Sequence, residues 1–255
     1  MIKNILKKLQ VVFNLFFLKT FCRNFRYKIE NPKTYPVVII SFNQFFYLKK
    51  LIDFLKKTKY ENIVIIDNAS TYPELLRYLE FLKKDKSVRI HRLNKNYGHL
   101  VFWKKKEFRM FYGQGYHVVT DPDIVPISSC PDDFLAIFKA KLDKHTEVSK
   151  VGFSLSLEDI PDANPLKIKI LNWEKQFWHK KTQDGDYLAE IDTTFALYRP
   201  YDQKLEKNFF TAIRTGYPLI ARHGGWYIDA ENLSVEQQYY FKTSNNSNTW
   251  KIKSL

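Results

Sequence analysis

The sequence Tyr116-His-Val-Val-Thr-Asp-Pro-Asp-Ile-Val-Pro126 joins a short strand-forming run to two carboxylates. Residues 116–120 predict a strand, which delivers Asp121 and Asp123 at its carboxyl end. Pro122 fixes φ, so a stiff turn presents both side chains. Hard oxygen ligands of this kind suit Mg²⁺ or Mn²⁺, and phosphate oxygens can complete the coordination shell. The alternative is an Asx-Pro turn that only closes the strand.

The chain before this motif alternates predicted strands with predicted helices. Leucine and isoleucine recur at helical spacing over residues 48–55 and 75–82, and a further helix is expected over about residues 102–112. Ser70 or Thr71 is expected to cap the helix that begins near Pro73. Such alternation predicts an α/β fold whose strands are parallel and joined by right-handed crossovers. The predicted strands cover residues 36–40, 63–66, 88–91 and 116–120.

A polar side chain follows each of these four strands. The residues are Asn43, Asp67, Asn96 and Asp121. Ligands of parallel sheets bind beyond the carboxyl ends of the strands, so we expect the four to border one crevice together with Asp123. Any one of them alone is more often an ordinary turn or helix cap. Their agreement across four strands favours a ligand site.

Composition limits the class of protein and its partners. The 255 residues, 45% of them apolar, suit one large α/β domain with a sizeable core. The net charge of +14 favours anionic partners such as acidic lipid or phosphorylated substrates. No zinc-finger spacing or basic leucine-zipper pattern supports nucleic acid, so no nucleic-acid partner is expected. Cys22 and Cys130 lie far apart and form no disulfide framework, which indicates a reducing, cytoplasmic compartment.

The first thirty residues form a region of their own. Their apolar run over residues 11–18 is interrupted by Asn14 and is too short to span a bilayer. The pattern predicts either a basic amphipathic helix lying on an anionic membrane surface or a helix packed on the protein's own core. The former would make the protein peripheral on the cytoplasmic membrane face. The apolar stripe consists of Ile2, Ile5, Leu6, Leu9, Val12, Phe13 and Phe16.

Beyond residue 126 the pattern becomes mixed. Residues 151–157 alternate apolar and small polar side chains and predict a half-buried strand. A second strand is expected over residues 191–198, with Glu190 and Asp192 on one face at its start. Residues 243–255 are polar and are expected to form a frayed tail.

Four segments together resemble a known family. They are Val37-Val-Ile-Ile-Ser-Phe-Asn43, Ile63-Val-Ile-Ile-Asp-Asn-Ala-Ser70, Leu93-Asn-Lys-Asn-Tyr-Gly98 and Val118-Val-Thr-Asp-Pro-Asp123. Their combination resembles the family 2-type nucleotide-sugar glycosyltransferases with the GT-A fold. The match is close over residues 36–126 and holds only in outline beyond them. One departure is Phe102-Trp-Lys-Lys-Lys106, where many relatives carry an Asn-X-Gly-rich helix start.

The resemblance implies a domain organisation. Residues 36–242 would form a single GT-A domain, with a Rossmann-like, mostly parallel central sheet flanked by helices. Residues 36–126 would be its nucleotide-binding half, and residues 127–242 a mixed acceptor half.

The resemblance also implies roles for the polar residues. The loop Ser41, Phe42 and Asn43 and the side chain of Asp67 would contact the nucleoside, and Asn96 would border the same pocket. Asp121 would engage the ribose and, with Asp123, a Mn²⁺ or Mg²⁺ ion on the diphosphate. His223 would be a third metal ligand, although a lone histidine is as often structural.

On the acceptor side, family members that invert configuration use a carboxylate as general base. Asp192 is the first candidate and Glu190 the second, while an orienting carboxylate is the alternative role. Trp178 or Trp226 would stack on a sugar, although core packing is the usual role of tryptophan. Four basic residues are candidates to neutralise the diphosphate, or else are solvated surface: Lys180, Lys181, Arg214 and Arg222.

The sequence thus predicts a metal-dependent, inverting glycosyltransferase. Its donor would be a nucleoside-diphosphate sugar of the UDP or GDP type. Its acceptor would be a glycan or lipid-linked sugar in surface polysaccharide or lipopolysaccharide biosynthesis. A retaining enzyme of the same fold is one alternative. A sugar nucleotidyltransferase is another, but no Gly-rich phosphate loop follows Ile40. A basic binding protein without activity would leave the aspartates without a shared role.

Overall fold

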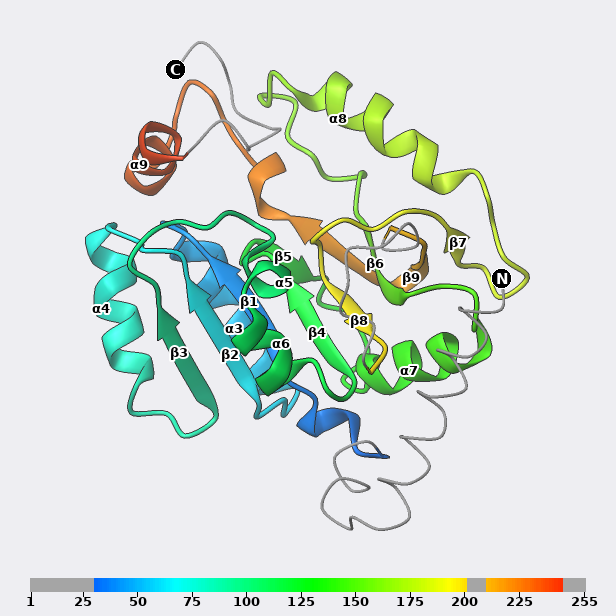
Figure 1. Ribbon diagram of the computed structural model, residues 1–255. Coiled ribbons are helices and arrows are strands. Elements are labelled where there is room, and N and C mark those ends of the chain that lie inside the picture. The colour runs from blue at the N-terminus through cyan, green and yellow to red at the C-terminus, as the bar shows by residue number, and fades with distance from the viewer. Residues whose placement is uncertain (1–29, 201–209, 245–255) are drawn as a thin grey trace.

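The computed structural model describes residues 30–200 and 210–244 and contains a nine-stranded sheet between helices (Figure 1). The sheet order is β3-β2-β1-β4-β8-β6-β9-β5, with β7 beside β9. The strands are β1 (Val37–Ser41), β2 (Ile63–Asp67), β3 (Val88–Arg92), β4 (His117–Thr120), β5 (Ile124–Pro126), β6 (Lys150–Leu155), β7 (Tyr187–Leu188), β8 (Ala196–Tyr198) and β9 (Ala212–His223). The helices are η1 (Pro32–Thr34), α3 (Phe46–Lys57), α4 (Pro73–Leu82), α5 (Val101–Lys104), α6 (Lys106–Tyr112), α7 (Phe134–Lys144), α8 (Lys167–Glu174), η2 (Lys175–Trp178), η3 (Gly224–Trp226) and α9 (Val235–Thr243).

The first four strands are parallel, as the alternating sequence predicts. Val37 of β1 is paired with Ile63 of β2 on one side and with Val118 of β4 on the other. All residues of β1, β2 and β4 are buried, which explains their nearly continuous apolar sequences.

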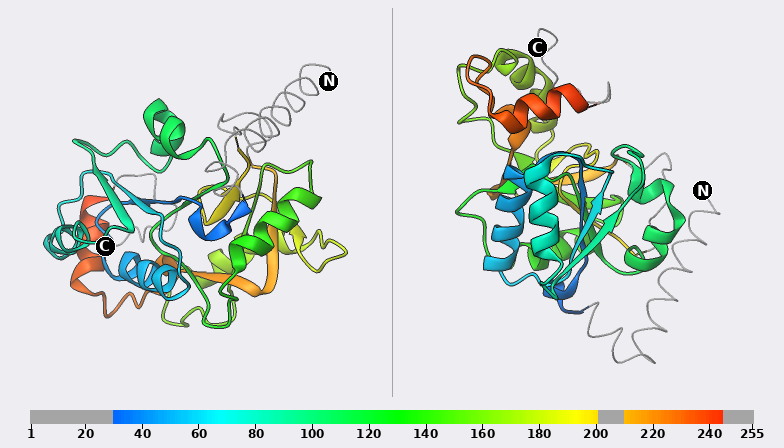
Figure 2. Two further views of the ribbon diagram at one scale, coloured as in Figure 1. Left: turned by 90° about the horizontal axis from the view of Figure 1, so that it is seen from below. Right: turned by 90° about the vertical axis from the view of Figure 1, so that its left-hand side faces the viewer.

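Alternate side chains of these strands enter two different cores. Val37 and Ile39 pack with α3, α4 and α7 on one face, whereas Val38 and Ile40 pack with α5 and α6 on the other. The right-hand view of Figure 2 shows α3 and α6 on opposite sides of the sheet. Helices therefore cover both faces, and the open crevices lie along the strand ends.

The strand order reverses direction at β1. The chain passes from β1 to β2 and β3 on one side, then crosses to β4 on the other side of β1. Because the crossovers of a parallel sheet are right-handed, the helices before and after this reversal lie on opposite faces. The carboxyl ends of β1 and β4 therefore flank an uncovered crevice, the usual ligand position in such sheets.

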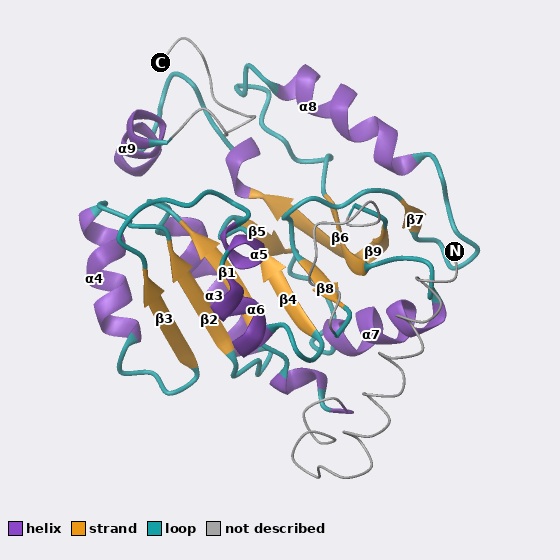
Figure 3. Ribbon diagram, in the orientation of Figure 1, coloured by secondary structure: helices purple, strands orange, loops and turns teal. Residues whose placement is uncertain are grey.

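The C-terminal half is mixed, and one burial prediction and one strand boundary in it are wrong. β8 pairs antiparallel with both β4 and β6, while β6 and β9 are parallel (Figure 3). The predicted half-buried strand is β6, which is wholly buried because sheet neighbours and α7 enclose it. The strand expected over residues 191–198 is only β8, so Glu190 and Asp192 lie in the preceding loop and not on one strand face.

Two local predictions also need correction. The helix expected over residues 102–112 is divided into α5 and α6, because Lys105 between them is extended at ψ 112°. Neither Ser70 nor Thr71 caps α4, whose N-cap is Tyr72 without a side-chain bond.

The architecture is the expected GT-A-like α/β arrangement, a Rossmann-like sheet flanked by helices with a mixed C-terminal part. The predicted amphipathic region, residues 1–30, lies outside the described residues except for Glu30. The predicted tail, residues 243–255, does so from residue 245 onward. Among the described helices, none combines the length and the apolar character that a membrane crossing requires.

Gly152 of β6 has no space for a side chain. A Cβ atom there would lie 2.3 Å from the carbonyl oxygen of Phe195 and 2.8 Å from Cβ of Ala196. We expect Gly152→Ala to lower the free energy of unfolding by about 1–3 kcal/mol through overpacking. Gly115→Ala is the matched control, since a Cβ there meets nothing within 4 Å. Denaturant unfolding of both variants measures the difference, and equal stabilities would contradict the close packing of β6 on β8.

Candidate functional site

A large cleft lies along the carboxyl ends of β1 and β4. Its volume is about 920 Å³, at the upper end of the range for ligand pockets. The loop after β1 and the residues after β2 line one side, and the residues after β4 line the floor. Residues of α8, η2 and the loop before β8 line the other side, and α9 lies across the top. The location agrees with the crevice that the strand order creates.

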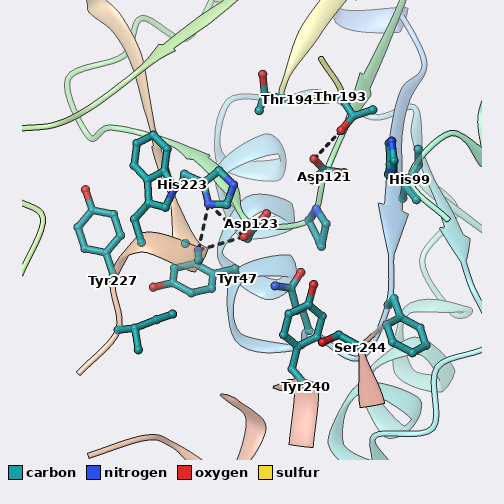
Figure 4. Close-up of a pocket in the computed structure, with 18 of the residues that line it drawn as sticks. Tyr47, His99, Asp121, Asp123, Thr193, Thr194, His223, Tyr227, Tyr240 and Ser244 are labelled. Carbon is teal, nitrogen blue, oxygen red and sulfur yellow. Dashed lines mark hydrogen bonds and ion pairs between the residues drawn. The ribbon is translucent and has the colours of Figure 1, made fainter. Parts of the chain in front are cut away.

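The floor of the cleft carries Asp121 and Asp123. The antiparallel ladder of β5 and β9 pairs Ile124 with His223, which brings His223 beside Asp123. Nδ1 of His223 lies 3.4 Å from Oδ2 of Asp123, and the Gly225 amide donates to both atoms, at 3.1 and 3.0 Å (Figure 4). Two of the three predicted metal ligands are therefore in contact.

Asp121 points away from this pair. Its Oδ2 accepts a hydrogen bond of 2.9 Å from Thr193, in the loop before β8 (Figure 4). Burial raises the pKa of Asp121 well above its usual value, and the negative charges of Asp123 and Asp192 raise it further. The floor thus concentrates negative charge in a poorly solvated place.

The carboxylates of Asp121 and Asp123 and the imidazole of His223 are suitable ligands for a divalent cation that a bound substrate also helps to hold. Within residues 30–200 and 210–244, no group of three or more His, Cys, Asp or Glu side chains is arranged to hold a metal ion, so the protein alone does not assemble the predicted set of three ligands. Mg²⁺ and similar ions in phosphate-transfer sites take one or two carboxylates and complete their shell with substrate oxygens and water. The raised pKa of Asp121 marks a charge imbalance that a cation would relieve.

His223 is held rigidly. Its ring stacks on Trp226 with centroids 4.9 Å apart and planes 6° apart. Trp226, predicted to stack on a sugar, is 1% exposed and supports the histidine.

On the nucleoside side, the predicted residues divide into two groups. Phe42 and Asn96 line the cleft, together with Asn68, which the sequence prediction missed although it directly follows Asp67. Ser41 and Asp67 are fully buried and are not among the lining residues. The carboxylate of Asp67 accepts from Nε of Arg92 at 3.1 Å and from the amide of Ser70 at 3.3 Å.

Asn43 organises the crevice from beneath. Its φ of 49° is in the left-handed region, which asparagine tolerates better than most residues. Oδ1 accepts from the amides of Thr71 and Tyr72 at 2.7 and 3.0 Å, and Nδ2 donates to Thr243 Oγ1 at 3.0 Å. One side chain thereby ties β1, the start of α4 and the end of α9 together.

Helix α9 covers the cleft through contacts that the sequence did not reveal. The carboxylate of Glu236 accepts hydrogen bonds of 3.0–3.1 Å from the amides of Phe45 and Phe46 at the start of α3. Tyr240 faces the floor, and burial followed by the charges of Asp123 and Asp121 raises its pKa. These residues lie more than 100 positions from their partners, and no local pattern links them.

The two base candidates lie in the loop before β8. Glu190 and Asp192 are exposed, and both line the cleft. The buried Lys150 donates to the carbonyl oxygen of Asp192 at 3.1 Å, and Tyr198 OH donates to it at 3.4 Å. These bonds engage the backbone carbonyl of Asp192 and hold the loop in place. The Asp192 side chain remains exposed at the cleft.

Of the remaining predicted residues, only Arg214 lines the cleft. Arg214 is not surface: it is 5% exposed and forms a 2.8 Å ion pair with Glu174. Trp178 lies outside the lining set and packs edge-on against Tyr187. Lys180 and Lys181 are exposed and, like Arg222, are not among the lining residues; Arg222 pairs with Asp159.

The raised pKa of Asp121 predicts a cost to stability. A carboxyl group whose pKa is higher in the folded than in the unfolded state contributes stability at low pH and loses it as pH rises. We expect Asp121→Asn, without ligand and near neutral pH, to have a higher melting temperature than the parent protein. The increase should be about 2–4 °C for each kcal/mol gained in the free energy of unfolding. The difference should vanish below about pH 4, where aspartate is neutral in the unfolded chain. Thermal melts across pH test this, with the exposed Asp53→Asn as control; a lower melting temperature at neutral pH would refute it.

No protein-family model matches the sequence, and no curated protein matches it either. Solved structures of similar fold include a mannosyltransferase, PcManGT from Pyrobaculum calidifontis, in complex with GDP-Man and Mn²⁺ (14% identity, TM-score 0.44, 76% of this chain and 58% of that chain). They also include a cytidylyltransferase from Leptospira borgpetersenii serovar Hardjo-bovis (13%, TM-score 0.34, 50% and 56%) and a mycobacterial protein (12%, TM-score 0.44, 77% and 70%). This chain covers less than two thirds of the length of the mannosyltransferase and of the cytidylyltransferase. Likenesses of this size identify no family, activity or substrate.

Proposed function

We propose that this chain is a metal-dependent glycosyltransferase that uses a nucleoside-diphosphate sugar. One observation carries the proposal: Asp121 and Asp123 form the floor of a cleft of about 920 Å³ at the crevice where the strand order reverses. A cleft of this size accommodates a donor and part of an acceptor together. Two carboxylates repel a diphosphate unless a cation lies between them, so the charge of the floor fits a cation-bound diphosphate.

The donor would lie along the β1 side. Phe42, Asn68 and Asn96 offer an aromatic ring and two amides to a nucleoside. Mn²⁺ or Mg²⁺, held by Asp123 and His223 with diphosphate oxygens and water completing its shell, would supply a Lewis acid that stabilises the charge on the departing diphosphate, and Asp121 would add negative charge beside it. Helix α9 would shield this part of the cleft from water.

The acceptor hydroxyl would approach from the opposite side. In the proposed reaction, its oxygen forms a bond to the anomeric carbon of the donor as the bond to the diphosphate oxygen breaks. The carboxylate of Asp192 takes the hydroxyl proton, and the nucleoside diphosphate leaves. Attack opposite the leaving group inverts the anomeric configuration. Glu190 is the second candidate for the base.

The biological acceptor that we propose is a glycan or lipid-linked sugar of a surface polysaccharide, handled at the cytoplasmic membrane face. The net charge of +14 supports an anionic surface as a partner.

Donor binding is tested by thermal melts with UDP or GDP, each with and without Mn²⁺. We expect one nucleotide with Mn²⁺ to stabilise the protein, since a ligand at 100 times its Kd contributes about 2.7 kcal/mol. Asp123→Ala should lose the nucleotide shift, whereas the exposed Asp53→Ala should keep it. No shift with either nucleotide, or a shift that survives Asp123→Ala, would remove the basis of the proposal.

The role of Asp192 is tested by kinetics after a screen of nucleotide sugars. We expect Asp192→Asn to lower kcat for transfer by about 10²–10⁴-fold, the usual contribution of a general base, with nucleotide affinity retained. Glu190→Gln is the comparison variant and should lose much less. NMR of the product anomer decides the stereochemistry. A product with retained configuration would exclude the base mechanism and favour a retaining enzyme of the same fold.

A further inference from the structure

One side of the cleft lies apart from the residues proposed to hold the donor. We define the far wall as Trp173 and Glu174 of α8, Phe177 of η2, Glu190 in the loop before β8, and Arg214 of β9, all of which line the cleft. It lies across the aspartate floor from the residues proposed to hold the nucleoside. Its neighbour Asp192 lies in the same loop as Glu190.

Arg214 builds this wall. Its Nη1 donates to Glu174 at 2.8 Å, its Nε donates to the carbonyl oxygen of Glu190 at 2.8 Å, and its guanidinium lies 3.8 Å from the ring centroid of Phe177. One buried side chain therefore connects α8, η2 and the loop before β8 to the central sheet. A surface fixed in this way loses little conformational freedom when a ligand binds.

The wall offers an aromatic platform. Trp173 is 52% exposed, and Phe177 meets it edge-on with centroids 6.2 Å apart. A half-exposed indole at a cleft presents an apolar face with a polar N–H at its edge. The C–H face of a sugar ring matches such a surface, while its hydroxyls need acceptors nearby.

The charge of the wall is negative. Glu174 neutralises Arg214, the one cation among the far-wall residues defined above. Within the described ranges, no hydrogen bond or ion pair engages the carboxylates of Glu190 and Asp192, which are exposed. Carboxylates accept hydrogen bonds from hydroxyl groups strongly and repel other anions.

We propose that the far wall is the acceptor subsite and that it selects an uncharged sugar. The ring stacks on Trp173, hydroxyl groups donate to Glu190, and a neighbouring hydroxyl reaches Asp192 for transfer. The proposal rests on the glycosyltransferase function above. It predicts rejection of sugars that carry a carboxylate or phosphate at this position, because Glu190 and Asp192 would oppose them.

The test compares p-nitrophenyl glycosides of neutral hexoses with p-nitrophenyl glucuronide, which shares their aglycone. Saturation-transfer NMR on the full chain, without donor, measures binding. We expect a neutral glycoside to bind and the glucuronide to bind at least about fivefold more weakly. Trp173→Ala should lower the affinity for the neutral glycoside about 5–10-fold. Phe111→Ala is the matched control, since this ring is 76% exposed on α6 and does not line the cleft.

A kinetic arm separates this subsite from the donor site. With UDP-glucose or GDP-mannose and Mn²⁺, Trp173→Ala should raise the acceptor KM while donor hydrolysis by water stays within about twofold. Glu190→Gln should reduce the difference in acceptor KM between neutral and anionic glycosides. Glucuronide binding as tight as that of the neutral glycosides, or equal behaviour of Trp173→Ala and Phe111→Ala, would overturn the subsite. Absence of any donor hydrolysis, with Trp173-dependent glycoside binding intact, would instead overturn the glycosyltransferase function and support the sugar-binding surface.

Discussion

The reversal of strand order at β1 is the constraint on which the rest of the structure depends. β1 is paired in parallel with β2 and with β4, so three carboxyl ends open at one edge of the sheet. Right-handed crossovers force α3 and α4 to one face and α5 and α6 to the other, which leaves the edge between β1 and β4 uncovered. The cleft, its aspartate floor and the covering helix α9 all lie at this edge. Without the reversal, the motif Asp121-Pro-Asp123 would close a strand and face no cavity.

The site places charge where the fold alone would not tolerate it well. Asp121 is held among neighbouring carboxylates, and burial with their repulsion raises its pKa. A structure selected only for stability would replace such a group or pair it with a cation. In the same cleft, Glu174 of α8 and Arg214 of β9 form a buried ion pair that connects these two elements. Asp121 therefore lacks a cationic partner among the described residues, whereas the charge of Glu174 is neutralised by Arg214 within the fold.

Side chains far apart in sequence shape the walls of the cleft. Glu236 binds the first amides of α3, Thr193 binds Asp121, and Lys150 fixes the loop that carries Asp192. Each bond joins elements that the topology has already brought together. Short loops that connect the elements lack regular patterns of their own, and their conformations depend on these tertiary partners.

The sequence by itself determined the four parallel strands, the α/β class and the position of the aspartate pair, because apolar runs and helical periodicity are local signals. It also located the polar residues at the strand ends. Only the tertiary structure decided which of these residues reach the cleft. The Asp67 side chain turns inward to Arg92, whereas the neighbouring Asn68 lines the cleft. Trp178 was a predicted sugar-stacking residue, but Trp173 lines the cleft and Trp178 does not. Burial and orientation of a side chain after a strand depend on partners more than twenty residues away, and no local sequence pattern encodes those contacts.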